Sequence, residues 1–217
     1  MPERITARVS MVEDFRWWSQ SGLEWDWFLS KDRGENERMA AGTALHAWME
    51  KASAGEFDEG RVGDYIFVFD CDAALNLVKV KEQRSFRDYG DLRVTGKVDA
   101  IEGGRITDYK LIINHQVEGE QYMDSYQWRY YLDIFGAHAF DYVIFEAHQE
   151  ADDIFRIKDV HKITQYRYSE LHQDCDNLAA EFLAAAQQSQ ELRSIASVGL
   201  EDIRGTENHQ IESANTR

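Results

Sequence analysis

The sequence predicts an α/β fold in which a mixed central β-sheet is flanked by helices. Three observations favour this class. Segments rich in β-branched residues follow one another closely over residues 75–113, and segments with helical periodicity lie on either side of them. An apolar segment at residues 140–145 is suited to a buried strand that returns to the same sheet.

The first predicted helix covers residues 38–51, because Leu45, Trp48 and Met49 recur at helical spacing. A short strand at residues 65–69 follows it. Three further strands are predicted at residues 75–84, 92–101 and 105–113, with turn residues between them at 88–91 and 103–104.

The second half of the chain alternates again between the two kinds of element. A helix is predicted at residues 121–135, followed by strands at residues 140–145 and 154–160. Residues 166–190 are rich in alanine and leucine, which predicts a long helix. Residues 194–217 have no sustained pattern and are predicted to be a mobile tail or a docking segment.

Length and composition indicate one domain over residues 1–193. The chain has 217 residues, of which 43% are hydrophobic, and its only proline is Pro2, so it can bury a substantial core and has no proline-rich linker. It has no signal-peptide-like start and no apolar run long enough for a membrane span. Two cysteines without patterned spacing favour a reducing compartment, so a cytoplasmic protein is expected.

The most informative segment is the predicted hairpin at residues 96–110. Asp99 lies on its first strand and the triplet Asp108-Tyr109-Lys110 on its second. Side chains alternate along a strand, so Asp108 and Lys110 point to one side and Tyr109 to the other. Two acids can bind a hard divalent cation, and a neighbouring lysine can hold water against a phosphate. Taken alone, the same residues are more typical of a surface hairpin with solvated charges.

Two helical segments supply further polar residues in a fixed order along the chain. His46 follows Gly42 in the first predicted helix and lies beside its apolar stripe. Gln127 and Tyr131 are four residues apart, which places them on one face of the helix at residues 121–135. Without the other motifs, this pair would be explained equally well as core-facing polar residues with satisfied hydrogen bonds.

The order Gly-x-x-x-His, Gly-x-x-Asp, Asp-x-Lys and Gln-x-x-x-Tyr resembles the RecB-like branch of the PD-(D/E)XK nuclease superfamily, which includes the CRISPR-associated exonucleases. The resemblance covers residues 42–131. It implies a restriction-endonuclease-like core and a metal-dependent deoxyribonuclease, more often an exonuclease that processes DNA ends in recombination, repair or phage DNA metabolism. DNA would be the substrate, and a recombination or repair protein could be a further partner.

The resemblance also implies a metal site that holds one or two Mg²⁺ or Mn²⁺ ions. Its ligands would be His46, Asp99, Asp108 and the backbone carbonyl of Tyr109. A histidine ligand tilts the preference toward Mn²⁺, because imidazole is softer than carboxylate.

The remaining roles concern catalysis. By the same resemblance, Lys110 would be the catalytic lysine, acting together with Asp99 and Asp108. Gln127 and Tyr131 would contact this lysine or the DNA near the scissile phosphate.

Two departures from the family pattern restrict the comparison. Some relatives bind an iron-sulfur cluster through four cysteines, but this chain has only Cys71 and Cys175, so no such cluster is expected within one chain. The helicase-fused relatives also carry motor domains for which 217 residues leave no room. The expectation is therefore a stand-alone nuclease.

Charge favours a rival hypothesis, because the formal net charge of −16 is unusual for a protein that binds DNA. Residues 79–110 are locally basic, with eight bases against six acids, whereas residues 111–155 hold one base and nine acids. The alternative is a non-catalytic acidic binding protein, either a DNA mimic or an assembly factor, built on a nuclease fold.

Two further groups of residues could contact DNA. The phosphate contacts are predicted at basic residues of the hairpin region, namely Arg84, Arg87, Arg93 and Lys97. An aromatic cluster could stack on bases of a single strand, or it could form part of the core or a partner interface: Trp17, Trp18, Trp25, Trp27 and Phe28.

Overall fold

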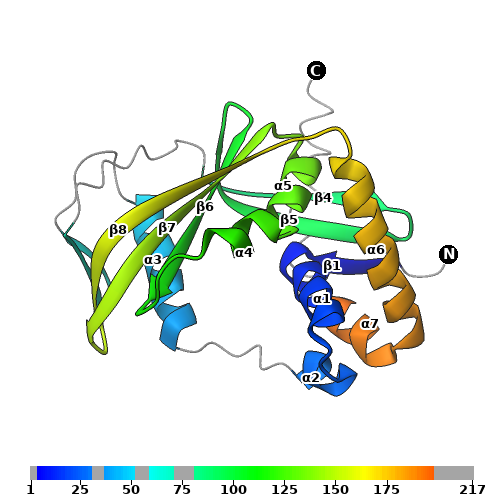
Figure 1. Ribbon diagram of the computed structural model, residues 1–217, viewed down its shortest axis with the longest axis horizontal. Coiled ribbons are helices and arrows are strands. Elements are labelled where there is room, and N and C mark those ends of the chain that lie inside the picture. Colours follow the sequence, from blue (N-terminus) through cyan, green and yellow to red (C-terminus); the bar gives the residue numbers. More distant parts are fainter. Residues whose placement is uncertain (1–3, 31–36, 52–58, 71–80, 198–217) are drawn as a thin grey trace, which may run out of the picture.

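The computed structural model describes residues 4–30, 37–51, 59–70 and 81–197, and its fold is α/β, with a mixed sheet flanked by helices (Figure 1). The strands are β1 Ile5–Arg8, β2 Glu59–Val62, β3 Tyr65–Phe69, β4 Lys81–Tyr89, β5 Leu92–Glu102, β6 Arg105–Ile113, β7 Ala139–Ala151 and β8 Ile154–Tyr166. The helices are α1 Val9–Ser21, α2 Trp25–Ser30, α3 Glu37–Lys51, α4 Gly119–Asp124, α5 Gln127–Phe135, α6 Leu171–Gln188 and α7 Gln190–Ser197.

The strands form one eight-stranded sheet in the order β1-β5-β6-β7-β8-β3-β2, with β4 also paired to β5. The β1–β5, β6–β7 and β3–β8 pairs are parallel, and the others are antiparallel. Each parallel pair requires a crossover segment between its two strands, such as the segment with α4 and α5 between β6 and β7.

The arrangement around β5 creates a gap in the sheet. Along one edge β5 pairs with β4 from Leu92 to Ala100. Along the opposite edge β1 pairs with residues 92–95, and β6 pairs only with residues 100–102. Within the described part of the chain, residues 96–99 of β5 therefore have no strand partner on that edge, and Asp99 lies at the point where β6 separates from β5.

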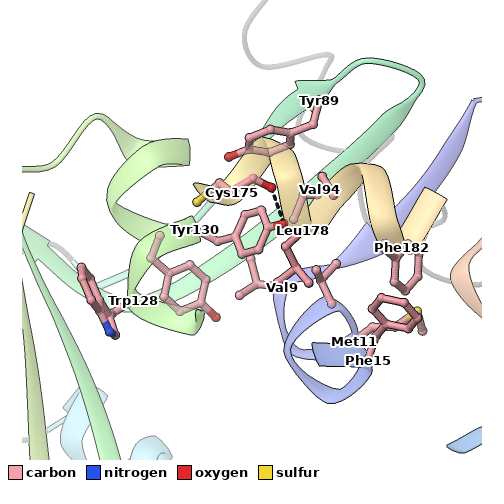
Figure 2. Close-up of a cluster of buried hydrophobic side chains, with 14 of the residues drawn as sticks. Val9, Met11, Phe15, Tyr89, Val94, Trp128, Tyr130, Cys175, Leu178 and Phe182 are labelled. Atoms are coloured by element: carbon pink, nitrogen blue, oxygen red, sulfur yellow. Dashed lines mark hydrogen bonds between the residues drawn. The ribbon is translucent and has the colours of Figure 1, made fainter. Parts of the chain in front are cut away.

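The first hydrophobic core lies on the face of the sheet covered by α1, α5 and α6. Its strand residues include Val94 and Val98. Figure 2 shows Tyr130 of α5 among the side chains of α1 and α6. The Tyr130 hydroxyl donates to the carbonyl of Cys175 at 2.7 Å, so its one polar atom is satisfied inside an apolar environment.

The second hydrophobic core lies on the opposite face, where α3 covers β3, β6, β7 and β8. Leu45 and Met49 of α3 are buried there against Tyr109, Phe67 and other apolar residues of the sheet. Burial of this helical stripe fixes the rotation of α3 about its axis, and with it the position of His46, the neighbour of Leu45.

The structure confirms several predicted elements. Residues 65–69 form β3, the strand predicted at residues 92–101 is β5, and the one at residues 105–113 is β6. The helix predicted at residues 38–51 is α3, and the strand predicted at residues 140–145 lies in the first half of β7. Of the predicted strand 75–84, only residues 81–84 lie within the described part of the chain, where they belong to β4.

The single helix predicted at residues 121–135 was wrong, because two helices occupy this region. The break falls at Ser125, which has an extended ψ of 141° and ends α4. Its hydroxyl accepts the backbone N–H of Gln127, which starts α5. Serine favours such local side-chain bonds, and these compete with a continuous helix.

The boundary between β8 and the following helix was also predicted wrongly. β8 does not end at Val160 but continues to Tyr166, because it pairs with β7 along its whole length. The helix α6 therefore begins at Leu171 and ends at Gln188. A short amphipathic helix, α7, then includes residues 194–197 of the predicted tail, and the rest of that tail lies outside the described residues. In the part of the chain that the structure describes, no helix is long and apolar enough to cross a membrane.

Candidate active site

Where β5 and β6 separate, a hydrogen bond to a side chain replaces the pairing between the two strands. The last ladder pair is Ala100 with Thr107, and beyond it the Oδ2 atom of Asp99 accepts the backbone N–H of Tyr109 at 2.8 Å. A carboxylate thus satisfies a backbone donor that the separating strands would otherwise leave unpaired. This contact holds Asp99 beside the Asp108-Tyr109-Lys110 segment.

His46 reaches the same point from α3. Its Nε2 atom lies 2.7 Å from the backbone oxygen of Tyr109, and its Nδ1 atom lies 3.2 Å from Oδ1 of Asp99. Burial lowers the pKa of His46, but the hydrogen bond to Asp99 and the charge of that carboxylate outweigh burial, so the pKa lies above its usual value. Three of the four predicted metal ligands, including the Tyr109 carbonyl, therefore meet directly.

Asp108 and Lys110 point to the face of the sheet that α4 and α5 cover, as the alternation of a strand predicts. The side chain of Asp108 is only 6% exposed, and its Oδ2 atom lies 2.8 Å from Nζ of Lys110. The two groups form a close ion pair, and Oδ2 has no further hydrogen-bond partner among the described residues. Such an atom has unused capacity to bind a cation or a donor.

The two carboxylates differ in their readiness to ionise. Burial raises the pKa of Asp108 above its usual value, and the charge of Asp99 adds to this although Lys110 opposes it. Burial acts on Asp99 too, but the hydrogen bond and charge of His46, together with the Tyr109 N–H, hold the pKa of Asp99 below its usual value. The pKa of Lys110 is raised, because the charge of Asp108 outweighs burial, so this lysine is charged at neutral pH.

Gln127 and Tyr131 of α5 lie above this group. Burial raises the pKa of Tyr131 to about 12, the charge of Asp108 adds to the rise, and Lys110 and a hydrogen bond with Gln127 oppose it. The charges of Asp108 and Lys110 are thus felt at the tyrosine hydroxyl. All five predicted catalytic residues come together at this place, Asp99 included.

Gly96 has a role that the sequence analysis missed. A Cβ atom at this position would lie 2.9 Å from Cε1 of Tyr131, closer than such atoms approach in proteins. Glycine therefore lets the tyrosine ring lie flat against β5, within the four residues that have no strand partner on one edge. The signal was present in the Gly-x-x-Asp motif, but it was interpreted only as a family feature.

Two further tyrosines also surround the site and were not predicted. Tyr122 of α4 and Tyr142 of β7 are 4.9 Å apart between ring centroids. Burial raises the pKa of each, and the charges of Asp108 and Lys110 act on both. The Tyr142 hydroxyl is buried, and a side-chain interaction with Ser125 opposes the rise of its pKa. Neither residue belongs to a motif, so no local signal could have found it.

The four predicted DNA-contacting residues do not form one cluster. Arg84 and Lys97 are cross-strand neighbours, and they share the face of β5 that carries Arg93 and Asp99. Arg93 is bound to Asp88 at 2.9 Å and stacks on a phenylalanine ring, and Lys97 pairs with Glu82. The fourth residue, Arg87, points to the opposite face.

The donor set suits a hard divalent cation. It contains one imidazole, two carboxylates and one backbone carbonyl, which together are ligands that Mn²⁺ and Mg²⁺ accept. Within the described ranges, no three or more His, Cys, Asp and Glu side chains are already arranged around a common point. His46 and Asp99 instead contact each other, while Asp108 contacts Lys110. The residues fit the ion, and its binding would replace the contact between His46 and Asp99.

Comparisons with known proteins add little to this geometry. No known protein family matches the chain, and no curated protein matches it significantly. A solved structure described as "Crystal structure of SSO0001" is similar over 87% of this chain and 79% of that chain, with a TM-score of 0.47 and 16% sequence identity. What the site does must therefore be inferred from its residues.

Proposed function

We propose that this protein is a divalent-metal-dependent deoxyribonuclease. The observation that carries the proposal is the meeting of His46, Asp99, Asp108 and Lys110 where β6 separates from β5. These residues come from segments up to 64 positions apart in the printed sequence. Acids, an imidazole and a lysine in one place are the groups that phosphodiester hydrolysis requires.

His46, Asp99, Asp108 and the Tyr109 carbonyl would hold the ion. Bound there, Mg²⁺ or Mn²⁺ would supply Lewis acidity and a water of lowered pKa. Lys110 keeps its positive charge beside Asp108 and would donate to a phosphate oxygen or to the attacking water.

Gln127 and Tyr131 would position Lys110 or the DNA, because they lie over the charged group from α5. Tyr131 also shields the site from water by its close contact with Gly96. We propose an exonuclease in preference to an endonuclease, and this preference rests on the family resemblance. The same resemblance implies DNA processing, and the two cysteines without patterned spacing favour the cytoplasm.

The net charge of −16 favours the second candidate, a non-catalytic acidic binding protein. A protein of that kind has no use for a partly buried lysine paired with a buried carboxylate. The charged group around Asp108 therefore weighs toward the enzyme, and activity measurements separate the two.

The decisive experiment is a cleavage assay with the full chain on end-labelled linear DNA and on circular DNA. We expect cleavage with Mn²⁺ and with Mg²⁺, no cleavage in chelator, and recovery when Mn²⁺ is added back, because the water nucleophile needs a cation to ionise near neutral pH. Preference for linear over circular DNA would indicate an exonuclease.

Lys110→Ala should lower the cleavage rate at least a hundredfold. It removes the only side-chain charge that is proposed to act on the attacking water or the phosphate. The matched control is Lys158→Ala, which removes a half-exposed lysine of β8 that is paired with Asp70. Cleavage that resists chelator, or that is equal in Lys110→Ala and in the parent, would contradict the proposal.

A further inference from the structure

The aromatic cluster of α1 and α2 divides into an inner and an outer part. Trp18, Trp25 and Phe28 pack against one another with ring centroids 4.7–5.7 Å apart, and Phe28 is fully buried. This inner part belongs to the first core. The outer part is the pair Trp17 and Trp27, which are 50% and 39% exposed.

The local sequence explains how the outer pair comes together. Gly22 ends α1 with a left-handed φ of 70°, which lets the chain turn sharply into α2. The rings of Trp17 and Trp27 then lie 5.4 Å apart between centroids, at an interplanar angle of 42°. Two half-exposed indole rings from different helices thus lie side by side at the surface.

A hollow of about 330 Å³ lies beside this pair and is lined by Trp17, Trp27, Glu13 and Asp14. The two acids are one helical turn before Trp17 on α1, which places all three on one side of the helix. Two indole rings and two carboxylates around one hollow form a site suited to a cation, because the ring faces carry negative potential. Both oxygens of Glu13 already accept from Arg16, so a cation would share this carboxylate with Arg16.

The charge around the hollow selects the kind of ligand. Residues 9–30 hold four acids and one base, Arg16. Arg16 is itself buried and paired with Glu13 and Asp124, so it does not offer a positive charge to a ligand. A phosphate chain would be repelled from this surface, which disfavours base stacking on the two tryptophans.

Exposure of large apolar groups gives a separate reason to expect a partner. Of the six exposed large hydrophobic residues in the described ranges, three belong to α1, α2 and the turn between them: Trp17, Leu23 and Trp27. Clustered exposed tryptophans mark interaction surfaces, and arginine and tryptophan are both enriched among residues that dominate protein interfaces.

We propose that the hollow formed by Glu13, Asp14, Trp17 and Trp27 binds an arginine side chain of a basic segment in a partner protein. The planar guanidinium stacks on the indole faces and donates to a carboxylate at the rim, which a lysine ammonium does less well. The site is separate from the charged group at Asp108, so the proposal does not depend on nuclease activity.

The test uses calorimetry with the full chain at physiological salt and an end-capped nona-arginine peptide as the probe. The double variant Trp17→Ala/Trp27→Ala keeps every charge, so binding that arises only from the net charge of −16 persists in it. We expect at least a tenfold loss of affinity in this variant. Tyr166→Ala, which removes an exposed aromatic ring on β8, is the matched control and should bind as the parent does. Nona-lysine should bind more weakly than nona-arginine.

Circular dichroism checks that the double variant folds. If it does not, Trp17→Ala alone serves, because its ring is half exposed, and at least a threefold loss is expected. Equal affinity of the parent and the variant for nona-arginine would overturn the proposal. So would loss of oligo(dT) binding in the variant with peptide binding kept, because the pair would then stack on bases.

Discussion

At the scale of single residues, the two carboxylates of the candidate site have opposite electrostatic environments. Asp99 is held ionised by His46 and the Tyr109 N–H, whereas burial makes Asp108 reluctant to ionise without a cation. Lys110 is the cation that the structure places beside it, with its Nζ atom 2.8 Å from Oδ2 of Asp108. Asp108 therefore depends on a positive charge, and a bound metal ion would provide a second one.

This dependence predicts different effects for two neighbouring substitutions. Asp108→Ala should abolish cleavage and weaken Mn²⁺ binding at least tenfold, because it removes a ligand. Lys110→Ala should abolish cleavage while Mn²⁺ still binds, since an ammonium donates and does not ligate. Isothermal titration with Mn²⁺ measures this, and Asp88→Ala, which removes an exposed acid on β4, is the control. If Asp108→Ala bound Mn²⁺ as the parent does, the assignment of Asp108 as a ligand would be wrong.

The residue-scale predictions that succeeded rest on local geometry. The period of two along a strand places Asp108 with Lys110 and puts Tyr109 in the opposite core, as the structure confirms. The contact of Tyr131 with Gly96 could not be predicted from spacing, because it joins a helix to a strand 35 positions earlier in the printed sequence. Only the tertiary arrangement determines which glycine an aromatic ring covers.

At the scale of elements, a buried carboxylate joins four segments on the side of the sheet that α5 and α6 cover. Asp133 of α5 is 1% exposed. It accepts from Tyr89 of β4 at 2.9 Å and from Arg167, between β8 and α6, at 2.9 Å. It also contacts Arg87 of β4 at 3.2 Å and Nδ1 of His172 of α6 at 2.8 Å.

These contacts predict that Asp133 is important for stability. Asp133→Ala should lower the free energy of unfolding by about 3 kcal/mol, because it leaves two guanidinium groups and a buried hydroxyl without their acceptor. Asp88→Ala removes an exposed carboxylate paired with two arginines and should cost under about 1 kcal/mol. Urea unfolding of both variants measures the difference. A smaller loss for Asp133→Ala than for Asp88→Ala would show that the network contributes little.

The elements that sequence patterns predicted are those whose partners are close in the chain. β5 and β6 form a hairpin with turn residues between them, so alternation and turn chemistry suffice. β1 was not predicted, because its four residues form a strand only through parallel pairing of Ile5 with Leu92 and its neighbours. The gap beside Asp99 depends on where β1 ends, so this central feature of the site could not be predicted from the sequence.

At the scale of the whole molecule, many positive charges are already used inside the fold. Arg87 and Arg167 bind Asp133, and Arg105 and Lys162 bind the buried Asp141. These four basic residues are paired within the fold, so they offer little positive charge to DNA against the net charge of −16. Affinity for DNA, if present, must come from few phosphate contacts and from the metal.

The last prediction concerns how such an acidic protein would hold DNA. In Lys110→Ala, which should not cleave, affinity for duplex DNA should rise when Ca²⁺ replaces chelator, because the ion cancels repulsion between Asp99, Asp108 and the phosphate. The dependence on salt should be shallow, with a slope of about −0.9 for each phosphate contacted. Fluorescence anisotropy across a salt series measures both quantities, and substitutions at Arg84 and Arg93 should reduce the slope, whereas Lys158→Ala should not. Affinity that is unchanged by metal, or absent at every salt concentration, would favour the non-catalytic acidic protein, because a phosphate beside Asp99 and Asp108 needs an ion to offset their charge.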